Sequence, residues 1–391
     1  MQKLGEIAEI STGFPFDGHK YTSIGIRVVR GENIGQGELH WEEKVDKRWN
    51  ESTSALDNYW LYEGDIVMQM DGNVGKNIAR IYTADPMLIA QRVACIRAKV
   101  KCSQDYIYGI LRTKLFKNYI ERCATGTSIK HISLQQISDF EFDFHLPEIQ
   151  AKLGRIIADI DDKIRVNRQI NDNLEAMAKQ LYDYWFVQFD FPNEEGKPYK
   201  SSGGAMVWNE KLKREIPQGW IASNYTDLFT IGNGQTMPQN EGFIPAYGGN
   251  GIVKMVEISN YPACIIIGRV GANCGSIHYS KVPCWVSDNA ISVCSKNDDW
   301  QPFLFYSFRL YNLSKNKGGS SQPLITHEAL KHLYFPMSEK HINQFCHIVN
   351  ELQDLIYSNQ QEILKLTKLR DELLPLLMNG QASVNYHLSD D

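Results

Sequence analysis

The stretch "GTSIKHISLQQISDFEF" (residues 126–142) has a counterpart in "GGSSQPLITHEALKHLYF" (residues 318–335), with the same order of glycine, serine and spaced apolar residues. When Gly126 is placed on Gly319, an offset of 193 residues, the two stretches match without a gap. The matched pairs are Ser128 with Ser321, Ile132 with Ile325, Ser133 with Thr326, Ile137 with Leu330, Phe140 with Leu333 and Phe142 with Phe335. Chance rarely matches so many positions in one register, so the match predicts an internal duplication.

The duplication extends upstream of these stretches. The segment "KLGEIAEISTG", from Lys3, resembles "NYTDLFTIGNG", from Asn224, and the comparison places Gly13 on Gly234. The segment "GDIVMQMDGNVGK", from Gly64, resembles "ACIIIGRVGANCGS", from Ala263, if one residue is inserted. In both, an apolar run typical of a strand opens into a glycine loop.

Downstream, each copy leads into a long helical pattern with a seven-residue repeat. The repeating positions are Leu153, Ile160, Asn167, Leu174 and Leu181 in the first copy, and Phe345, Leu352, Asn359, Leu366 and Leu373 in the second. A companion set four residues on reads Ile157, Ile164, Asn171 against Val349, Ile356, Ile363. Such a repeat predicts a coiled-coil seam, although an amphipathic helix packed on its own domain gives a similar pattern.

The sequence therefore predicts an α+β chain with two globular modules, two long antiparallel helices and a pseudo-two-fold repeat. The expected segments are a first module at 1–146, a helix at 147–190, a linker at 191–215, a second module at 216–336, and a second helix with the C-terminal tail at 337–391. The linker assignment rests on the glycine, proline and charged residues of that segment.

Composition sets the class of protein. The chain has 391 residues, of which 43% are apolar and 22% charged, as is ordinary for a globular protein of two or more domains. The sequence has no apolar run long enough to span a membrane and no signal-peptide layout, so a cytoplasmic location is expected. The eight cysteines form no C-x-x-C pair and lack zinc-ligand spacing, so reduced and mostly buried thiols are expected.

The net charge of −5 argues against unselective coating of nucleic acid, but the charge is distributed unevenly. From Val100 to His131 there are six basic residues and two acidic ones, and from Pro302 to Lys331 there are four and one. Both basic surpluses fall at equivalent places in the repeat. A local basic face on an acidic protein is typical of directed phosphate contact, and a solvated helix face is the alternative.

Catalytic and cofactor motifs are missing from the sequence. The segment "GNVGKN" has neither the spacing nor the final hydroxyl residue of a phosphate-binding P-loop, and "GRVGANCG" is not a dinucleotide-binding G-x-G-x-x-G. There is no H-E-x-x-H metal motif and no G-x-S-x-G nucleophile elbow. The sequence therefore indicates a protein that is not an enzyme and has no metal or cofactor.

The whole chain resembles the DNA-specificity subunit of a type I restriction-modification system. The likeness is carried by "LYDYWFVQFDFPNEEGKPYKSSGGAMVWNEKLKREIPQGW" (181–220), by "LRDELLPLLMNGQ" (369–381), and by "GTSIKHIS" with its counterpart. One departure is that the first module starts directly at "KLGEI", without the lead seen at "IPQGW".

The resemblance implies a non-catalytic subunit that reads a two-part DNA sequence and binds two copies of an adenine methyltransferase subunit, which restriction subunits join for cleavage. In agreement, the N-P-P-[YF] motif of adenine methylation is missing. Two alternatives remain: a stand-alone DNA-binding regulator built from a repeat, and a coiled-coil scaffold that binds only proteins.

Three sets of residues are expected to carry these functions. The DNA-contacting set, on glycine loops and turns that could instead be plain tight turns between strands, is Asn73, Lys76, Ser128, Lys130, Arg269, Asn273, Ser320, Ser321 and Gln322. The methyltransferase-contacting set is Tyr182, Tyr184, Trp185 and Phe186, because aromatic residues anchor interfaces, although they could instead seal the helix onto the second module. Asn167 and Asn359, at the middle of the two repeats, are expected to meet and fix the helix register, and two exposed asparagines on a curved helix are the alternative. That register would separate the half-site centres by about one helical turn of DNA, roughly 34 to 36 Å.

Overall fold

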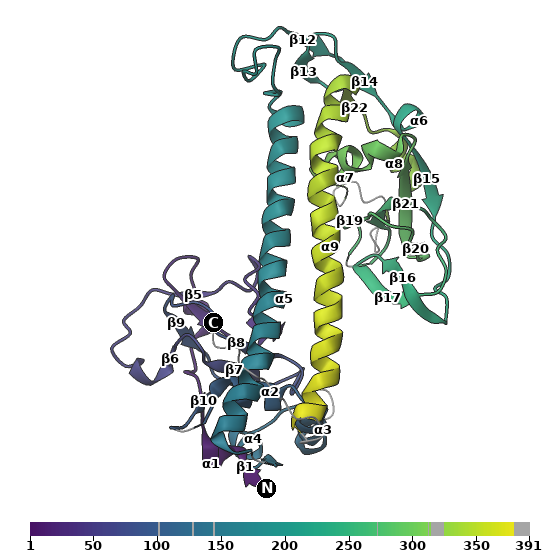
Figure 1. The fold of residues 1–391 in the computed structure, drawn as a ribbon. Helices are drawn as coiled ribbons and strands as arrows, with labels where there is room; N and C mark the ends of the chain where they lie inside the picture. The colour runs from purple at the N-terminus through teal and green to yellow at the C-terminus, as the bar shows by residue number, and fades with distance from the viewer. Residues whose placement is uncertain are drawn as a thin grey trace, which may run out of the picture. The chain divides into compact units, whose positions relative to one another are not determined.

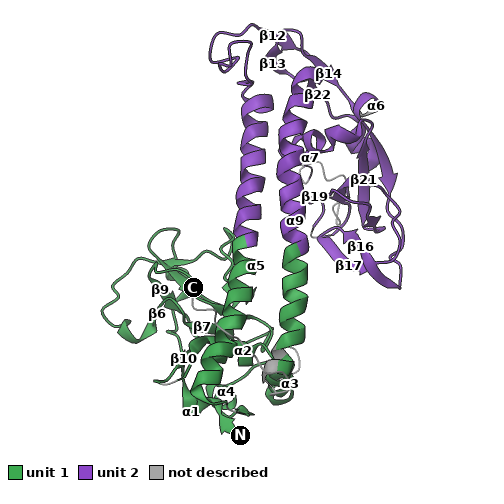
Figure 2. Ribbon diagram, in the orientation of Figure 1, with its two compact units in different colours: residues 1–166, 362–391 green, residues 167–361 purple. Residues whose placement is uncertain are grey.

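The computed structural model describes residues 1–100, 102–126, 129–143, 145–271, 273–311, 313 and 324–378. The chain divides into two compact units, which are residues 1–166 with 362–391, and residues 167–361 (Figure 2). Each unit contains one globular module and a segment of each long helix. No helix in the described part of the chain is long and apolar enough to cross a membrane.

The module of the first unit contains two mixed sheets. The larger has the strand order β2 (Ala8–Thr12), β10 (Val93–Ala98), β7 (Ile66–Gln69), β8 (Ile78–Arg80) and β4 (Gln36–Gly37). The smaller has the order β5 (Arg48–Trp49), β3 (Ile26–Val29), β9 (Met87–Ile89) and β6 (Trp60–Leu61). The helices are α1 (Leu4–Ile7), α2 (Gln104–Leu111), α3 (Lys114–Cys123) and α4 (Leu134–Ser138). A short pair, β1 (Gln2–Lys3) and β11 (Glu141–Phe142), joins the two ends of the module.

The module of the second unit repeats this plan (Figure 1). Its larger sheet has the order β15 (Phe229–Asn233), β21 (Ala290–Ser295), β18 (Cys264–Gly268) and β19 (Ile277–Ser280). Its smaller sheet has the order β17 (Gly251–Val256), β16 (Glu241–Gly248) and β20 (Trp285–Val286). The helices are α6 (Tyr225–Leu228), α7 (Gln301–Leu310) and α8 (His327–Lys331), and β14 (Ile221–Ser223) pairs with β22 (Phe335–Met337).

The two larger sheets are in the same register, residue by residue. The pair formed by Ile96 and Ile66 in the first unit corresponds to the pair formed by Val293 and Ile265 in the second. The β7–β8 hairpin closes with Gln69 N–H donating to Asn77 O (3.1 Å), and the β18–β19 hairpin closes with Gly268 N–H donating to Ser276 O (2.9 Å). The inserted residue expected from the sequence is therefore wrong, because these hairpins match at a constant offset of 199 and the glycines do not all superimpose.

The match of Gly13 with Gly234 reflects a close crossing of backbones. A Cβ atom on Gly13 would lie 2.1 Å from Ile89 O, and one on Gly234 would lie 1.7 Å from Ser287 O. Both distances are far below van der Waals contact, so a side chain at either position would displace the neighbouring strand.

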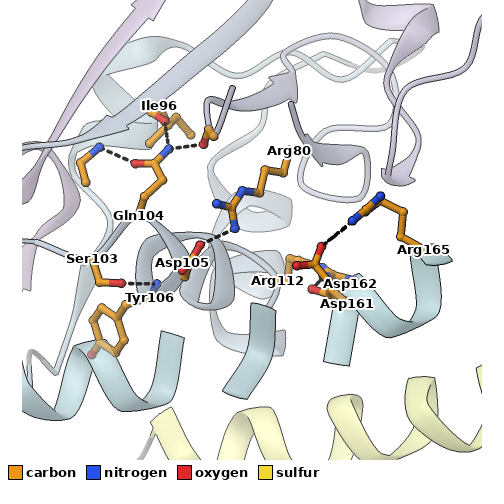
Figure 3. A network of polar contacts seen from close by, with 12 residues as sticks. Arg80, Ile96, Ser103, Gln104, Asp105, Tyr106, Arg112, Asp161, Asp162 and Arg165 are labelled. Carbon is orange, nitrogen blue, oxygen red and sulfur yellow. Dashed lines mark hydrogen bonds and ion pairs between the residues drawn. The ribbon is translucent and has the colours of Figure 1, made fainter. Parts of the chain in front are cut away.

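A buried glutamine at the start of α2 has a counterpart at the start of α7. Gln104 Oε1 accepts from Ala98 N–H (2.6 Å) and its Nε2 donates to Ile96 O (3.0 Å), as Figure 3 shows. Gln301 makes the same two bonds, with Ser295 N–H (2.7 Å) and Val293 O (2.8 Å). In each unit the glutamine satisfies backbone groups at the end of the central strand and attaches the helix there.

The long helices are α5 (Pro147–Tyr182), which continues into one π-helical turn at Asp183–Val187, and α9 (Glu339–Met378). In the second unit, Asn171 of α5 meets Asn359 of α9, and the Tyr182 ring lies 5.7 Å from that of Phe345. Residue numbers rise along one helix as they fall along the other, so the helices are antiparallel, as predicted. The first unit shows the same order, with Lys163 paired to Glu362 and Asp161 to Arg370.

The amide that meets Asn359 across the seam belongs to Asn171. Asn359 Nδ2 donates to Asn171 Oδ1 at 2.9 Å, four residues beyond the expected partner Asn167. The sequence repeat placed Asn171 in the companion set, and the antiparallel register sets it opposite Asn359. A paired amide at a seam position favours one register, because a slipped register would leave an amide unpaired against apolar residues. A register role for Asn167, which is buried, stays a prediction.

The segment 191–215, expected to be a linker, is folded onto the second unit. It contains β12 (Met206–Asn209), which pairs with β13 (Arg214–Pro217). Phe191 stacks on Tyr199 (4.8 Å) and Trp220 (5.1 Å), and this aromatic group joins the core of the unit. Polar and glycine-rich composition correctly indicates turns here, but Phe191 and Tyr199 attach the segment to the core of the second unit.

All eight cysteines are free thiols, and five of them are buried. Cys264 and Cys284 lie in an apolar cluster of the second module with their sulfur atoms 3.6 Å apart. In the described ranges, no three His, Cys, Asp or Glu side chains are grouped so that they could hold a metal ion.

An ionic cluster attaches both long helices to the first module. Asp161 of α5 pairs with Arg112, which follows α2 (Figure 3). It also pairs with Arg370 of α9 at 3.0 Å. These side chains are only 8%, 14% and 14% exposed, respectively. In the second unit Arg309, the counterpart of Arg112, pairs instead with Glu175 of α5. The two modules therefore hold the helices through the same arginine position but through different acidic partners.

We expect Asp161→Ala to lower the free energy of unfolding of the first unit by about 3 to 5 kcal/mol, because it leaves Arg112 buried without a carboxylate and Arg370 with only the exposed Asp371. Lys163→Ala is the matched control, since it removes an exposed ion pair of the same helix and should cost less than about 1 kcal/mol. Urea unfolding of the full chain measures both. Equal effects of the two substitutions would show that the buried cluster does not attach the helices.

Candidate nucleic-acid interface

Three loops of the first module meet at one end of its larger sheet. They are the loop from Met70 to Asn77 between β7 and β8, the turn 90–92 between β9 and β10, and the segment 129–132 after the glycine-serine turn. Met70 N–H donates to Arg92 O (3.0 Å), Ile132 N–H donates to Met70 O (3.0 Å), and Gly72 N–H donates to Lys130 O (2.8 Å). These bonds bring residues from distant parts of the sequence together.

A fourth loop, residues 30–33, completes this surface, which we call the first tip. Ala90 N–H donates to Val29 O (2.9 Å), and Gly31 lies against the side chain of Gln69. Arg30 in this loop pairs with Glu32 (2.5 Å) and lies over the Tyr21 ring at 5.3 Å. The first tip is therefore residues 30–33, 70–77, 90–92 and 129–132.

The second module builds an equivalent surface, the second tip, from residues 248–251, 269–271, 273–276, 287–289 and 324–325. Arg269 N–H donates to Asn289 O (2.9 Å), and Ile325 N–H donates to Arg269 O (3.0 Å). Ser287 N–H donates to Tyr247 O (2.9 Å), as Ala90 N–H does to Val29 O in the first module. The two tips thus share one backbone hydrogen-bond scheme.

The described part of the expected DNA-contacting set lies on these tips. Asn73 and Lys76 are exposed on the loop after β7, Lys130 is exposed on the adjoining segment, Asn273 is exposed, and Arg269 is half-buried. Their contact with DNA stays a prediction. The remaining members, Ser128, Ser320, Ser321 and Gln322, lie outside the described residues.

Lys76 and Arg269 occupy different places on their tips. Under the offset of the hairpins, Lys76 corresponds to Gly275 and Arg269 to Met70, which is buried. The glycines of "GNVG" and "GRVG" suggest a common position, but strand pairing determines which residues correspond. Any cation of the second tip that contacts DNA therefore does so from a different point on the surface.

Sequence reasoning missed several polar residues of the first tip. His131 Nδ1 lies 2.5 Å from Asp71 Oδ1, and Arg92 Nη1 lies 3.3 Å from Asp71 Oδ2. Arg92 has a side chain that is 60% exposed and a backbone φ of +67°. The signal available in the sequence was the neighbouring basic run, because neither the sign of φ nor the meeting of three loops can be read from residue types.

The electrostatics of the first tip suit an anionic ligand. The first tip carries the cations Arg30, Lys76, Arg92 and Lys130 against the carboxylates Glu32 and Asp71. The described part of the second tip carries one cation, the half-buried Arg269, and one carboxylate, Asp288. In the adjoining α8, burial and then the charges of Arg269 and Lys331 lower the pKa of His327. Loops that carry long cations and amides can contact phosphates and base edges.

The prediction that Tyr182, Trp185 and Phe186 face a partner protein is wrong, because all three are buried in the core of the second unit. The Phe186 ring lies 5.0 Å from Phe303 of α7 and 5.3 Å from Phe345 of α9. The second module itself covers this aromatic surface. Tyr184, the fourth member of the set, is exposed.

Tyr184 belongs to an apolar stripe on the outside of α5. Ile170, Met177 and Tyr184 recur every seven residues and are exposed, with Met177 at 56%. The positions 192 residues later on α9 include Leu369 and Leu376, which are also exposed, in the first unit. We call these residues the outer stripes. Repeated apolar positions outside the seam are typical of a helix that packs against a further helix.

Comparison with known proteins agrees with this architecture. The family model described as "Type I restriction modification DNA specificity domain" matches residues 1–176 and 217–370.

Two curated relatives match most of the chain. The type I restriction enzyme MjaIX specificity subunit of Methanocaldococcus jannaschii is 25% identical over 329 residues, which are 77% of this chain and 74% of that one. The HindI specificity subunit of Haemophilus influenzae is 25% identical over 359 residues, which cover 71% of this chain and 77% of that one. The crystal structure of a type I restriction-modification S subunit from M. genitalium matches with a TM-score of 0.61 at 17% identity, over 96% of this chain and 95% of that one.

Proposed function

The chain belongs to the type I restriction modification DNA specificity domain family, and from that premise we propose that each tip reads one half of a two-part DNA sequence. As a specificity subunit the chain recognises DNA, and its partner subunits carry out the catalysis. The half-sites differ because the tips differ in their side chains.

The observation that supports this proposal is the shared hydrogen-bond scheme of the two tips. The bond from Ile132 N–H to Met70 O recurs between Ile325 and Arg269, while the exposed side chains around it change. The phosphate backbone of duplex DNA is close to two-fold symmetric, so two equivalent surfaces suit two half-sites. Diverged side chains on equivalent loops then give an asymmetric target.

Phosphate contact is the proposed role of the exposed lysines. Lys76 and Lys130 are exposed on loops of the first tip whose backbones are held by hydrogen bonds. Arg269, on an equivalent loop of the second tip, is half-buried. Such contacts position a protein on DNA and carry no sequence information, so base recognition falls to other residues of the tips.

The long helices are the proposed determinant of the unread spacer. The seam in each unit fixes the helix register, through Asn171 with Asn359 in the second and Asp161 with Arg370 in the first. With that register, we expect the half-site centres to lie about one helical turn of DNA apart, roughly 34 to 36 Å.

The test of bipartite recognition is a module exchange. Replacing residues 216–336 with the equivalent segment of a relative should change one half of the recognised sequence and leave the other half and the spacer unchanged. The reason is that each tip is built only from residues of its own unit. Sequencing of the methylated sites in cells measures the target directly. A change in both halves would contradict independent reading by the two tips.

The proposed partners are two methyltransferase subunits, which restriction subunits join for cleavage. The outer stripes are their proposed docking surface, because the apolar residues recur at equivalent positions in both units and each could receive one subunit. An apolar helix face of this kind fits an amphipathic helix of a partner. Two equivalent stripes therefore account for two copies.

We expect Met177→Asp to prevent assembly with one methyltransferase subunit while the thermal stability of the isolated chain stays unchanged, because the side chain is exposed. Ala176→Asp is the matched control, since it places the same charge on an exposed position of α5 that lies about 100° around the helix from Met177. Size-exclusion chromatography with light scattering gives the stoichiometry. Full assembly of the Met177 variant would exclude the stripe as the docking surface.

A further inference from the structure

An isolated β-bridge between two chain segments occurs in both tips, with polar side chains in one tip and apolar side chains in the other. In the first tip, Asp71 and His131 form a single antiparallel bridge, and in the second Val270 and Leu324 form the same bridge. The backbone plan is thus retained at this point, while a polar pair in one tip replaces an apolar pair in the other. All four side chains are at least partly exposed.

The turn beside this bridge also differs between the tips. Arg92 lies in the turn between β9 and β10 of the first module, and Asn289 lies in the turn between β20 and β21 of the second. Both residues are exposed, and both accept the equivalent backbone hydrogen bond, from Met70 and Arg269 respectively. At three adjacent positions the two tips therefore carry different side chains on the same backbone hydrogen-bond scheme.

Arg92 is held in an unfavourable backbone conformation. Among the described residues, only Arg92, Phe189 and Lys213 combine a positive φ with a side chain, and the equivalent Asn289 is not one of them. Such a conformation is unfavourable for an arginine and is typical of functional sites. It places an exposed guanidinium beside Asp71 without burying it.

A carboxylate on a surface that faces DNA is repelled by the phosphates, so the presence of Asp71 in the first tip needs an explanation other than contact with DNA. Its carboxylate accepts from His131 and lies within 3.3 to 3.4 Å of Arg92, so it orients both side chains. The contacts of Arg92 are long and exposed, so a base edge can replace them at little cost. The carboxylate therefore acts as a positioning group for the guanidinium.

Building on the proposed function, we propose that positions 71, 92 and 131 of the first tip, and 270, 289 and 324 of the second, determine which bases the two half-sites contain. Arg92 reads a guanine, since a guanidinium donates two hydrogen bonds to guanine O6 and N7. Asn289 reads an adenine, since a carboxamide pairs with adenine N6 and N7. Val270 beside it contacts a thymine methyl group.

The test is selection of bound duplexes from a library randomised in both half-sites, with the full-length chain in its native assembly. For Arg92→Ala we expect the preference for one G·C pair in one half-site to fall by about tenfold or more, with the other half-site unchanged. For Asn289→Ala we expect the same loss at one A·T pair in the other half-site. Arg92→Lys, which keeps the charge but not the two-pronged donor, should retain a weakened preference for guanine.

Lys76→Ala is the matched comparison, because loss of a phosphate contact should weaken binding to all sequences about equally. If Arg92→Ala also weakens all sequences equally, alters both half-sites, or changes no preference, the assignment is overturned. Failure of the proposed function looks different, since the unaltered chain would then select no two-part sequence at all.

Discussion

The hydrogen bond from Ile132 N–H to Met70 O, repeated from Ile325 N–H to Arg269 O, is the contact on which each half of the molecule depends. It joins the segment after the glycine-serine turn to the loop that follows the central strand. That segment leads directly into α4 or α8 and then into a long helix, so the bond ties the exposed tip to the helical framework. Both isoleucine side chains are buried beside this contact, which explains why the two sequences match at Ile132 and Ile325.

The two units keep this contact but hold their helices by different physical means. In the first, the buried carboxylate of Asp161 pairs with two guanidinium groups, and its removal leaves Arg112 buried without a carboxylate. In the second, Arg309 pairs with the partly exposed Glu175, and the Tyr182 hydroxyl pairs with Ser307 at 2.9 Å inside an aromatic core. Duplication has therefore preserved the backbone scheme and allowed the energetics of attachment to diverge.

The sequence predicted the features that depend on periodicity and on the internal duplication. The seven-residue repeats, together with the two-fold duplication, predicted antiparallel long helices. The match of Gly13 with Gly234, which the sequence showed only as part of the duplication, falls at a close crossing of strands. The sequence did not predict which aromatic side chains are buried. Tyr184 and Trp185 are neighbours, and only Trp185 lies on the side of the helix that the second module covers. Arg92 was missed for a related reason, since its place depends on loops far apart in the chain and on a positive φ.

Amide hydrogen exchange of the full-length chain, with and without a duplex that carries its complete target, tests the central claim most directly. The account predicts slower exchange in residues 70–77 and 90–92 together with 269–271, 273–276 and 287–289, and slowing of only one of these two groups when one half-site is scrambled. Slowing confined to α5 and α9, or to one tip on the complete target, would contradict the claim that two equivalent tips each read half of the sequence.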